Sequence, residues 1–331
     1  MIEPMLVISR SEVEALLDLD ELVEALASAS SDLSGGRASM PARVGAFAPE
    51  RSGMLAAMVG YAPSLGALTA KLVSVFPENA AGPLPTHQAA IVIFDPLTGE
   101  PLALMDGTYI TAVRTAAGSA LATRLLARPD SSALALLGTG VQARAHGRAI
   151  PRVRPITEVR VAGRDPAKAR ALATELASEL GVRARGTDSY AEAVAGADVV
   201  CVATHSRDPV LRREWLAPGT HVNSVGWNPE GRELDEGTVR DSLLVVESRD
   251  AVLAPVPSGS NDLLEPMRNG LLDAEDLREV GELVDGTRPG RADPTQITLY
   301  KSVGVAVQDA AAAALVLAAA RERGIGQEVV V

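Results

Sequence analysis

The chain has few of the residues on which several classes of protein depend. Only one of its 331 residues is a cysteine, Cys201, so no disulfide can form within the chain, as is typical of proteins from a reducing cytoplasm. Cys201 stands in the apolar run 199–203, which predicts a buried strand residue rather than a nucleophile. Histidines are also few, and His146, His205 and His221 show no metal-ligand spacing, so the sequence predicts no metal site.

Aromatic residues and positive charge are scarce, and long apolar runs are missing. Aromatics make up 3% of the chain and the formal net charge is −11, which argues against a nucleic-acid surface. The alanine-rich run 310–320 is too short to cross a bilayer, and charged residues flank it. Residues 1–10 lack the basic start and apolar core of a secretory signal. We therefore expect a cytoplasmic protein whose partners are neither nucleic acids nor membranes.

A glycine-containing stretch, residues 133–149, organises the rest of the chain. Its apolar start predicts a buried parallel strand, and Gly138, Gly140 and Ala143 then form the pattern G-x-G-x-x-A before an alanine-rich helix. In such a loop the first glycine permits a tight turn and the second lets the backbone approach a pyrophosphate. The alanine lets the helix pack close to the strand.

The start of that helix is the predicted binding site for a dinucleotide. Its backbone amides face the anion, helped by the helix dipole. The residues of the loop are Gly138, Thr139, Gly140, Val141 and Gln142. A tight turn without a ligand is the alternative interpretation of the motif alone. A second strand–helix unit, which begins at Glu158, favours the nucleotide.

The pattern of the chain differs on the two sides of this stretch. Before it, Ser9 and Glu12 predict a capping box, Asp20 a second helix cap, and Gly35 the end of that helix. Turn residues then separate short runs that predict a mostly antiparallel sheet, namely 43–47, 54–60, 68–75, 88–94 and 102–105. After it, strands and helices alternate to about residue 250, which predicts a doubly wound parallel sheet. A last, apolar helix is expected at 302–323.

Six segments together resemble the ornithine cyclodeaminase/mu-crystallin family: 40–43 (MPAR), 71–73 (KLV), 105–108 (MDGT), 114–117 (RTAA), 138–143 (GTGVQA) and 301–309 (KSVGVAVQD). The resemblance implies an α/β fold in which a Rossmann dinucleotide-binding domain, residues 116–302, is inserted in an α+β substrate-binding and dimerisation domain, residues 1–115 plus 303–331. It also implies a homodimer. Members of the family perform hydride chemistry at a carbon that bears an amino nitrogen and stands next to a carboxylate.

Three cations of the first domain match the substrate-binding residues of the family, namely Arg43, Lys71 and Arg114. A bidentate arginine holds the carboxylate of a 2-imino or 2-oxo acid in one orientation. Lys71 stands in an apolar run, and we expect it to be catalytic; the alternative is a lysine whose head reaches water while its stem packs. Thr86 and Gln88 are expected beside the same pocket, with the intervening His87 on the other face of the strand.

The residues after the second strand of the Rossmann domain bear on the choice between NAD(H) and NADP(H). An acidic residue there binds the ribose in NAD enzymes. Asp165 could do so, or it could cap the helix that Pro166 begins. The cap leaves Gly163 where NAD-dependent members of the family have aspartate, and Arg164 able to pair with a 2′-phosphate. We therefore expect NADP(H) to be preferred, with NAD(H) as the alternative.

Other polar residues are predicted near the nicotinamide. Thr204 and Ser206 follow a predicted strand, where a Rossmann crevice lies, although ordinary loop polarity explains them equally well. Ser302 matches a serine of the family close to the nicotinamide ring.

One stretch, residues 226–234, departs from the family pattern. Cyclodeaminases carry a catalytic aspartate where this chain has Trp227, followed by Asn228, which we expect to contact substrate. An indole or an amide cannot act as the base that cyclodeamination needs. The sequence thus favours reduction of a 2-imino acid or cyclic ketimine, or the reverse amino-acid dehydrogenation. An ornithine cyclodeaminase with Glu230 as base and a non-catalytic NADPH-dependent binding protein remain as alternatives.

Overall fold

The computed structural model describes residues 4–330, which form two compact units. Residues 4–114 and 305–330 make unit 1, and residues 115–304 make unit 2. Unit 1 is therefore built from both ends of the chain. In the described part of the chain no helix combines the length and the apolar character that a membrane crossing requires.

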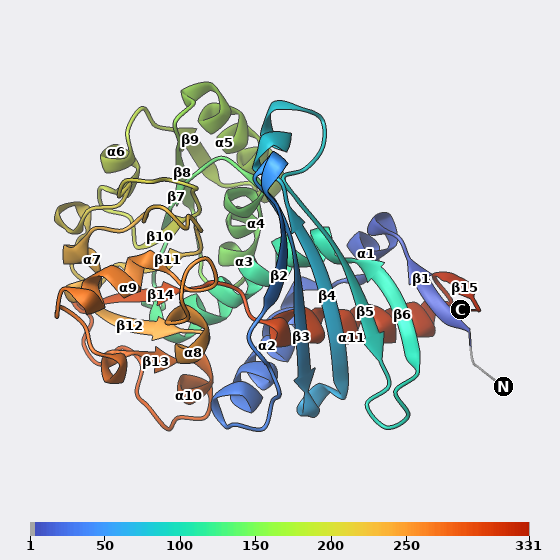
Figure 1. The fold of residues 1–331 in the computed structure, drawn as a ribbon. Helices are drawn as coiled ribbons and strands as arrows, with labels where there is room; N and C mark the ends of the chain where they lie inside the picture. The colour runs from blue at the N-terminus through green and yellow to red at the C-terminus, as the bar shows by residue number, and fades with distance from the viewer. Residues whose placement is uncertain (1–3, 331) are drawn as a thin grey trace. The chain divides into compact units, whose positions relative to one another are not determined.

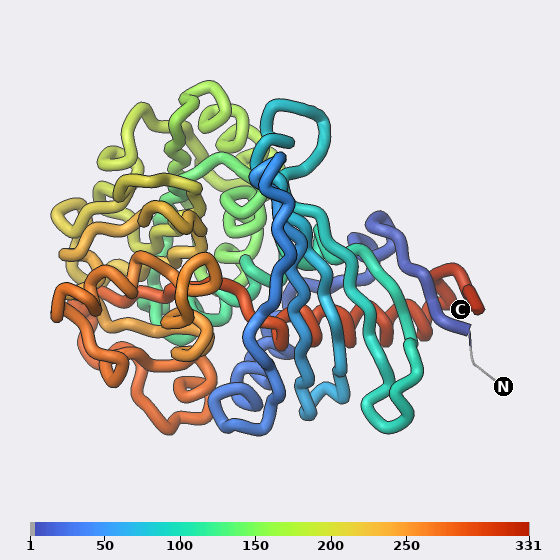
Figure 2. The backbone as a smooth tube through the Cα atoms, viewed as in Figure 1, coloured from blue at the N-terminus to red at the C-terminus, as the bar shows by residue number. Residues whose placement is uncertain are grey.

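Unit 1 contains a seven-stranded sheet in the order β15-β1-β6-β5-β4-β3-β2 (Figure 1). Strands β2 to β6 pair antiparallel, as predicted, whereas β1 pairs parallel with β6. Strand β1, which precedes Ser9, was not predicted; it pairs with β15 near the other end of the chain, as Figure 2 shows. The strands are β1 (Met5–Ile8), β2 (Val44–Ala48), β3 (Gly53–Ala62), β4 (Ala67–Val75), β5 (His87–Phe94), β6 (Pro101–Asp106) and β15 (Gln327–Val329).

Helices cover one face of this sheet. The capping box of Ser9 and Glu12 is confirmed. The second cap was predicted wrongly: Asp18, not Asp20, accepts the free amides of the first turn, because the helix begins two residues earlier than expected. The helices are α1 (Arg10–Leu16), α2 (Leu19–Ser34) and α11 (Ala306–Arg323), and α3 (Gly107–Leu126) leads into unit 2. Helix α11 packs on β3, β4 and β5, and its backbone passes so close to Gly60 that a Cβ there would lie 2.9 Å from the Cβ of Ala306.

Unit 2 contains an eight-stranded parallel sheet in the order β13-β12-β14-β11-β10-β7-β8-β9, with helices on both faces (Figure 1). This confirms the doubly wound, Rossmann-type fold class. Two strands of the sheet, β13 and β14, were not predicted. The strands are β7 (Ala133–Leu137), β8 (Glu158–Ala162), β9 (Arg183–Gly186), β10 (Val199–Val202), β11 (His221–Ser224), β12 (Ser242–Val246), β13 (Arg278–Glu279) and β14 (Ile297–Lys301). The helices between them are α4 (Val141–Ala149), α5 (Pro166–Leu180), α6 (Tyr190–Val194), α7 (Glu236–Arg240), α8 (Arg249–Val252), α9 (Asn261–Arg268) and α10 (Val280–Val284).

The chain order of this sheet reverses between β7 and β10. From β7 the chain proceeds outward to β8 and β9, and from β10 it proceeds the other way to β11. In open parallel sheets, ligands bind outside the carboxyl ends of the strands at such a reversal.

The residue Cys201 of β10 is buried in this sheet, and burial raises the pKa of its thiol to about 12, which excludes the reactive thiolate.

Candidate active site

Lys71 and Arg114 of unit 1 meet at one carboxylate, that of Asp309 in the first turn of α11. The Nζ atom of Lys71 lies 2.7 Å from Oδ2 of Asp309, and Nε of Arg114 donates to Oδ1 over 3.0 Å. Gln308 also accepts a hydrogen bond from Arg114, over 2.9 Å. All three charged side chains are almost completely buried, and that of Lys71 is 2% exposed. The head of Lys71 therefore does not reach water, which contradicts the alternative interpretation of this lysine.

The charges of this group do not balance. Two buried cations share one carboxylate, and Arg43 lies close enough for its charge to lower the pKa of Lys71. Burial is the largest cause that lowers this pKa, and the charge of Arg114 adds to it. Asp309 acts the other way, and the resulting pKa of Lys71 is about 8. An excess of buried positive charge next to a donor of this pKa is suited to an anionic substrate that needs a proton.

The faces of the strand predicted for His87 and Gln88 are wrong. Strand β5 pairs with β4 so that His87 stands opposite Val75 and Gln88 opposite Ser74. Since side chains alternate along a strand, Gln88 lies on the face away from Lys71, and His87 lies on the same face as Lys71. Thr86 precedes the strand, and its hydroxyl lies 3.1 Å from Nδ1 of His87. The pairing register, which local sequence does not reveal, decides these directions.

In unit 2 the glycine loop has the geometry that a dinucleotide requires. Gly138 has φ +123°, and a Cβ there would lie 2.5 Å from the carbonyl oxygen of Ala203, so only glycine fits. A Cβ on Gly140 would meet nothing within 4 Å, so the space in front of the N-terminus of α4 is open. Ala143, in the first turn of α4, is buried. The residues present therefore fit a pyrophosphate at the start of α4.

The residues at the end of β8 bear on the choice of dinucleotide. Asp165 caps α5, and its side chain accepts from the amides of Ala167 and Lys168. Arg164 is exposed, and a Cβ on Gly163 would lie 2.7 Å from Cγ2 of Thr139. The carboxylate of Asp165, which would bind the ribose if the protein used NAD(H), is thus engaged in capping the helix.

The three polar residues predicted near the nicotinamide have protein partners. Thr204 donates from both its amide and its hydroxyl to Glu233, over 3.0 Å each. The hydroxyl of Ser206 donates to the carbonyl of Asp208. The hydroxyl of Ser302 donates to Glu247 over 2.8 Å. Ser302 lies between β14 and α11, so the predicted start of this last helix at residue 302 is wrong by four residues.

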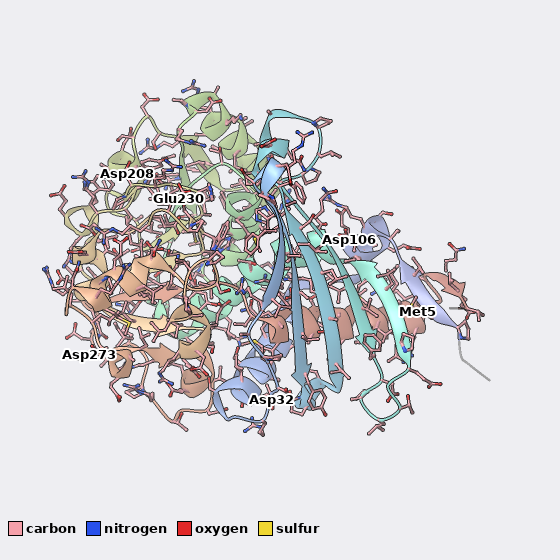
Figure 3. All side chains as sticks on the ribbon, in the orientation of Figure 1. Met5, Asp32, Asp106, Asp208, Glu230 and Asp273 are labelled. Carbon is pink, nitrogen blue, oxygen red and sulfur yellow. The ribbon has the colours of Figure 1, made fainter. Side chains whose placement is uncertain are left out.

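The departing stretch forms a loop after β11. The indole of Trp227 donates to the carbonyl of Pro257 over 2.7 Å. The amide of Asn228 donates to the carbonyl of Ser206 over 3.1 Å and accepts from the amide of Glu230, so this side chain stabilises the loop. Glu230 is 66% exposed and pairs with Arg207 at 2.5 Å (Figure 3). An exposed carboxylate in an ion pair is poorly suited to act as a base.

Sequence reasoning missed several buried charged residues that organise these sites. Asp309 stands in the first turn of an alanine-rich helix whose other charges lie in its last turn, and this isolated charge was the available signal. Lys301 lies within a segment that carries the resemblance, and Glu233 lies within the stretch 226–234 that departs from it, although neither was singled out. Glu247 accepts from the amides of Val303 and Gly304 and had no signal of its own.

Within residues 4–330 no three histidine, cysteine, aspartate or glutamate side chains are grouped so as to hold a metal ion. His146 and His221 are buried and hydrogen-bonded to neighbouring side chains. Burial lowers the pKa of His146 to about 4 and that of His221 to about 3, so both stay neutral at physiological pH.

The fold and the glycine loop define a two-unit α/β protein with a Rossmann-type unit, and unit 1 contains a buried cluster of cations around Asp309. The chain belongs to the ornithine cyclodeaminase/mu-crystallin family, whose model matches residues 3–324.

Individual relatives cover most of the chain. Ketimine reductase mu-crystallin of Mus musculus is 39% identical over 296 residues, which is 89% of each protein. The structure of Thermococcus litoralis Δ1-pyrroline-2-carboxylate reductase in complex with NADH and L-proline is 41% identical, with a TM-score of 0.94 over 98% of this chain and 100% of that one. An archaeal alanine dehydrogenase dimer with bound NAD is 31% identical, with a TM-score of 0.91 over 98% and 99%.

Proposed function

We propose that this protein is an NAD(P)H-dependent oxidoreductase that reduces a 2-imino acid or cyclic ketimine to the amino acid, or runs the reverse dehydrogenation. The observation that carries the proposal is the buried cluster in which Lys71 and Arg114 share one carboxylate. A substrate carboxylate supplies the missing negative charge. The relatives named as ketimine and pyrroline-2-carboxylate reductases support this class of reaction.

The residues of unit 1 have distinct functions in this reaction. Arg114 and Arg43 hold the carboxylate of the substrate in one orientation. A nicotinamide dinucleotide bound at the glycine loop of unit 2 supplies the hydride to the imine carbon. Lys71, or a water molecule that it holds, provides the proton that the imine nitrogen gains, and its pKa of about 8 is suited to proton transfer near neutral pH.

Two features of this chain argue against cyclodeamination. The residue at the position of the catalytic aspartate is Trp227, and the substitute base, Glu230, is exposed and paired with Arg207. A non-catalytic binding protein has no need of a buried proton donor next to the carboxylate-binding cations.

The preferred dinucleotide in our proposal is NADP(H). Exposed Arg164 is available to a 2′-phosphate, and Asp165 is engaged as a helix cap. A relative binds NADH, so the preference requires its own test. We expect a lower Michaelis constant for NADPH than for NADH. The R164A variant should raise the Michaelis constant for NADPH and leave that for NADH unchanged. The D165S variant keeps a cap and should change neither; a selective loss of NADH affinity in that variant would assign Asp165 to the ribose instead.

The proposal includes a cytoplasmic homodimer in which unit 1 binds substrate and forms the dimer, while unit 2 binds the dinucleotide. The face of the unit 1 sheet opposite Lys71 supports the dimer, because it exposes apolar side chains from three neighbouring strands: Val44, Leu55, Val59 and Leu72. An exposed apolar surface of this kind marks an interface. A relative is described as a dimer.

A substrate screen tests the reaction. Cyclic imines, and 2-oxo acids mixed with amines, are incubated with the protein and NADPH, and the loss of NADPH absorbance is followed. We expect turnover with the wild type, and none with the K71A variant, which should still bind NADPH. Turnover unchanged in K71A would remove Lys71 from the mechanism, and ammonia release from ornithine with proline as product would favour the cyclodeaminase.

A further inference from the structure

A second buried charged cluster, in unit 2, is not used by the chemistry above. It consists of Lys301 at the end of β14, Glu233 in the loop after β11, and Asp262 in the first turn of α9, and is called here the Lys301 network. None of the three side chains is more than 5% exposed. Charged groups are costly to bury unless their hydrogen bonds are made inside the protein.

The ammonium group of Lys301 has one partner for each of its three protons. Its Nζ donates to the hydroxyl of Ser224 and to the carbonyl of Gly226, over 3.0 Å each, and lies 2.7 Å from Oδ2 of Asp262. The other oxygen of Asp262 accepts from the amides of Glu233 and Leu234. Lys301 is therefore fully coordinated where it stands.

Glu233 is equally well satisfied. Its Oε1 accepts from the hydroxyl of Ser224 over 2.7 Å and from the amide of Gly226 over 2.8 Å. Its Oε2 accepts from the amide and the hydroxyl of Thr204 over 3.0 Å each. The network thus binds residues that follow two neighbouring parallel strands, β10 and β11, at the edge of the sheet where Rossmann folds bind ligands.

Gly226 is the residue that the network holds most completely. Glu233 binds its N–H and Lys301 its C=O. A Cβ at this position would lie 1.9 Å from Oε2 of Glu233 and 2.5 Å from the carbonyl oxygen of Thr204, so no other residue fits. The next residue in the chain is Trp227, which occupies the position of the cyclodeaminase aspartate. The direction in which the chain leaves β11 toward Trp227 is therefore set by buried charges.

We propose that Lys301, Glu233 and Asp262 are positioning residues that hold Trp227 and Thr204 in the arrangement required for imine reduction. In this proposal they act through the backbone of Gly226 and through the two hydrogen bonds to Thr204. The kinetic part of this proposal rests on the proposed function. Its structural part concerns the placement of Trp227 alone and can be tested without a known substrate.

Tryptophan fluorescence gives a direct measurement. The chain has two tryptophans, and Trp215 lies in the 3-10 helix Arg213–Trp215, outside the loop that contains Trp227. A W215F protein therefore has Trp227 as its single emitter. Reduced nicotinamide absorbs in the range in which tryptophan emits, so quenching of Trp227 by added NADPH reports on their mutual placement. In this background we compare K301M, which removes the charge and keeps a similar length, with a matched control.

The matched control is D198N. Asp198 is also a largely buried carboxylate of unit 2 with an arginine partner, Arg128, and it accepts from the amides of Ser132 and Ala133. It precedes β10 and therefore lies at the amino end of the strand that Thr204 follows. Its replacement should lower Tm without changing Trp227 emission or the kinetic constants.

For K301M we expect a shifted emission maximum of Trp227, altered quenching by NADPH, and a fall in kcat/KM for the imine of about tenfold or more, as is typical of a displaced reaction geometry. A K301M protein that differs from its parent only in Tm, as the control does, would overturn the proposal.

If K301M does not fold, S224A replaces it. That variant removes one hydroxyl between Lys301 and Glu233, and we expect smaller changes in the same direction; no change of emission or kcat/KM there also overturns the proposal. If the wild type reduces no imine, the proposed function fails, while the emission of Trp227 still decides whether the network positions this residue.

Discussion

At the scale of single residues, the pair of Lys71 and Asp309 makes the sharpest prediction. If protonated Lys71 is the proton donor, kcat/KM should fall as the pH rises through about 8, the pKa of this lysine. In D309N the charge and hydrogen bond that raise this pKa are lost, while burial and Arg114 still lower it. The fall in kcat/KM should therefore begin at a lower pH, and the maximal rate should decrease because Lys71 loses its fixed position.

The measurement is the pH profile of kcat/KM for the wild type and D309N, with D32N as the control. Asp32 is a buried carboxylate of the same unit that pairs with Arg37 and accepts from the amide of Ser64 (Figure 3). Its replacement should reduce stability by an amount on the order of 1–3 kcal/mol and leave the profile unchanged. A D309N profile that coincides with that of the wild type would mean that Lys71 is not the titrating group.

Single residues also show where sequence reasoning reaches its limit. The three cations of unit 1 could be found from a resemblance, because their segments are distinctive. Asp309 lies in another of these segments, but its role was not predicted, because its partner Arg114 lies 195 positions away in the chain and only folding brings the two together. The direction of Gln88 depends on the register between β4 and β5, and a register shift of one residue reverses every side chain.

At the scale of elements, the loop between β7 and α4 gives a prediction that separates folding from binding. G138A places a Cβ against the carbonyl of Ala203 at a positive φ, so it should destabilise unit 2 by about 1–3 kcal/mol. G140A meets no atom of the protein and should leave Tm unchanged, but it should weaken dinucleotide binding because the methyl group occupies the space of the pyrophosphate. Thermal unfolding and NADPH titration of both variants provide the measurement. Equal affinity of G140A and the wild type would place the pyrophosphate elsewhere.

Most elements with a strong local pattern could be predicted, and the missed ones have a physical explanation. The starts of strands β7 and β8 and of helix α5 were predicted correctly, because apolar runs and a proline-containing cap mark them. Strand β14 was missed because Thr298 and Lys301 interrupt its apolar character, although both are buried. Its lysine is stabilised by Asp262, a contact that no pattern within the strand reveals.

At the scale of the whole molecule, net charge and local charge differ in sign. The chain carries −11 overall, yet Lys71, Arg114 and Arg43 concentrate positive charge around a single buried carboxylate. The overall charge therefore argues against large polyanions as partners, whereas the local charge is compatible with a small anionic substrate. The division of the chain into two units could also be predicted, because the antiparallel strands β2 to β6 and the strands of the parallel sheet each occupy a continuous block of the sequence.

The homodimer is the last prediction, and it concerns the apolar face of the unit 1 sheet. Leu55 and Val59 lie on β3, and both point away from the face that carries Lys71, because Met58 stands opposite Lys71 and side chains alternate. The double variant L55E/V59E places two negative charges from each protomer in a twofold interface, where they repel each other. Sedimentation velocity should then show a monomer, while the wild type sediments as a dimer.

The matched control is L97E, at an apolar side chain that is 93% exposed in the turn between β5 and β6 and does not belong to this face. It adds the same kind of charge to the same unit and should leave the dimer intact. Because the two strand positions are themselves 47% and 41% exposed in a single chain, their replacement should leave the fold of unit 1 unchanged, and circular dichroism checks this. A double variant that still sediments as a dimer would show that this face does not form the interface. The exposed apolar side chains would then need a different partner.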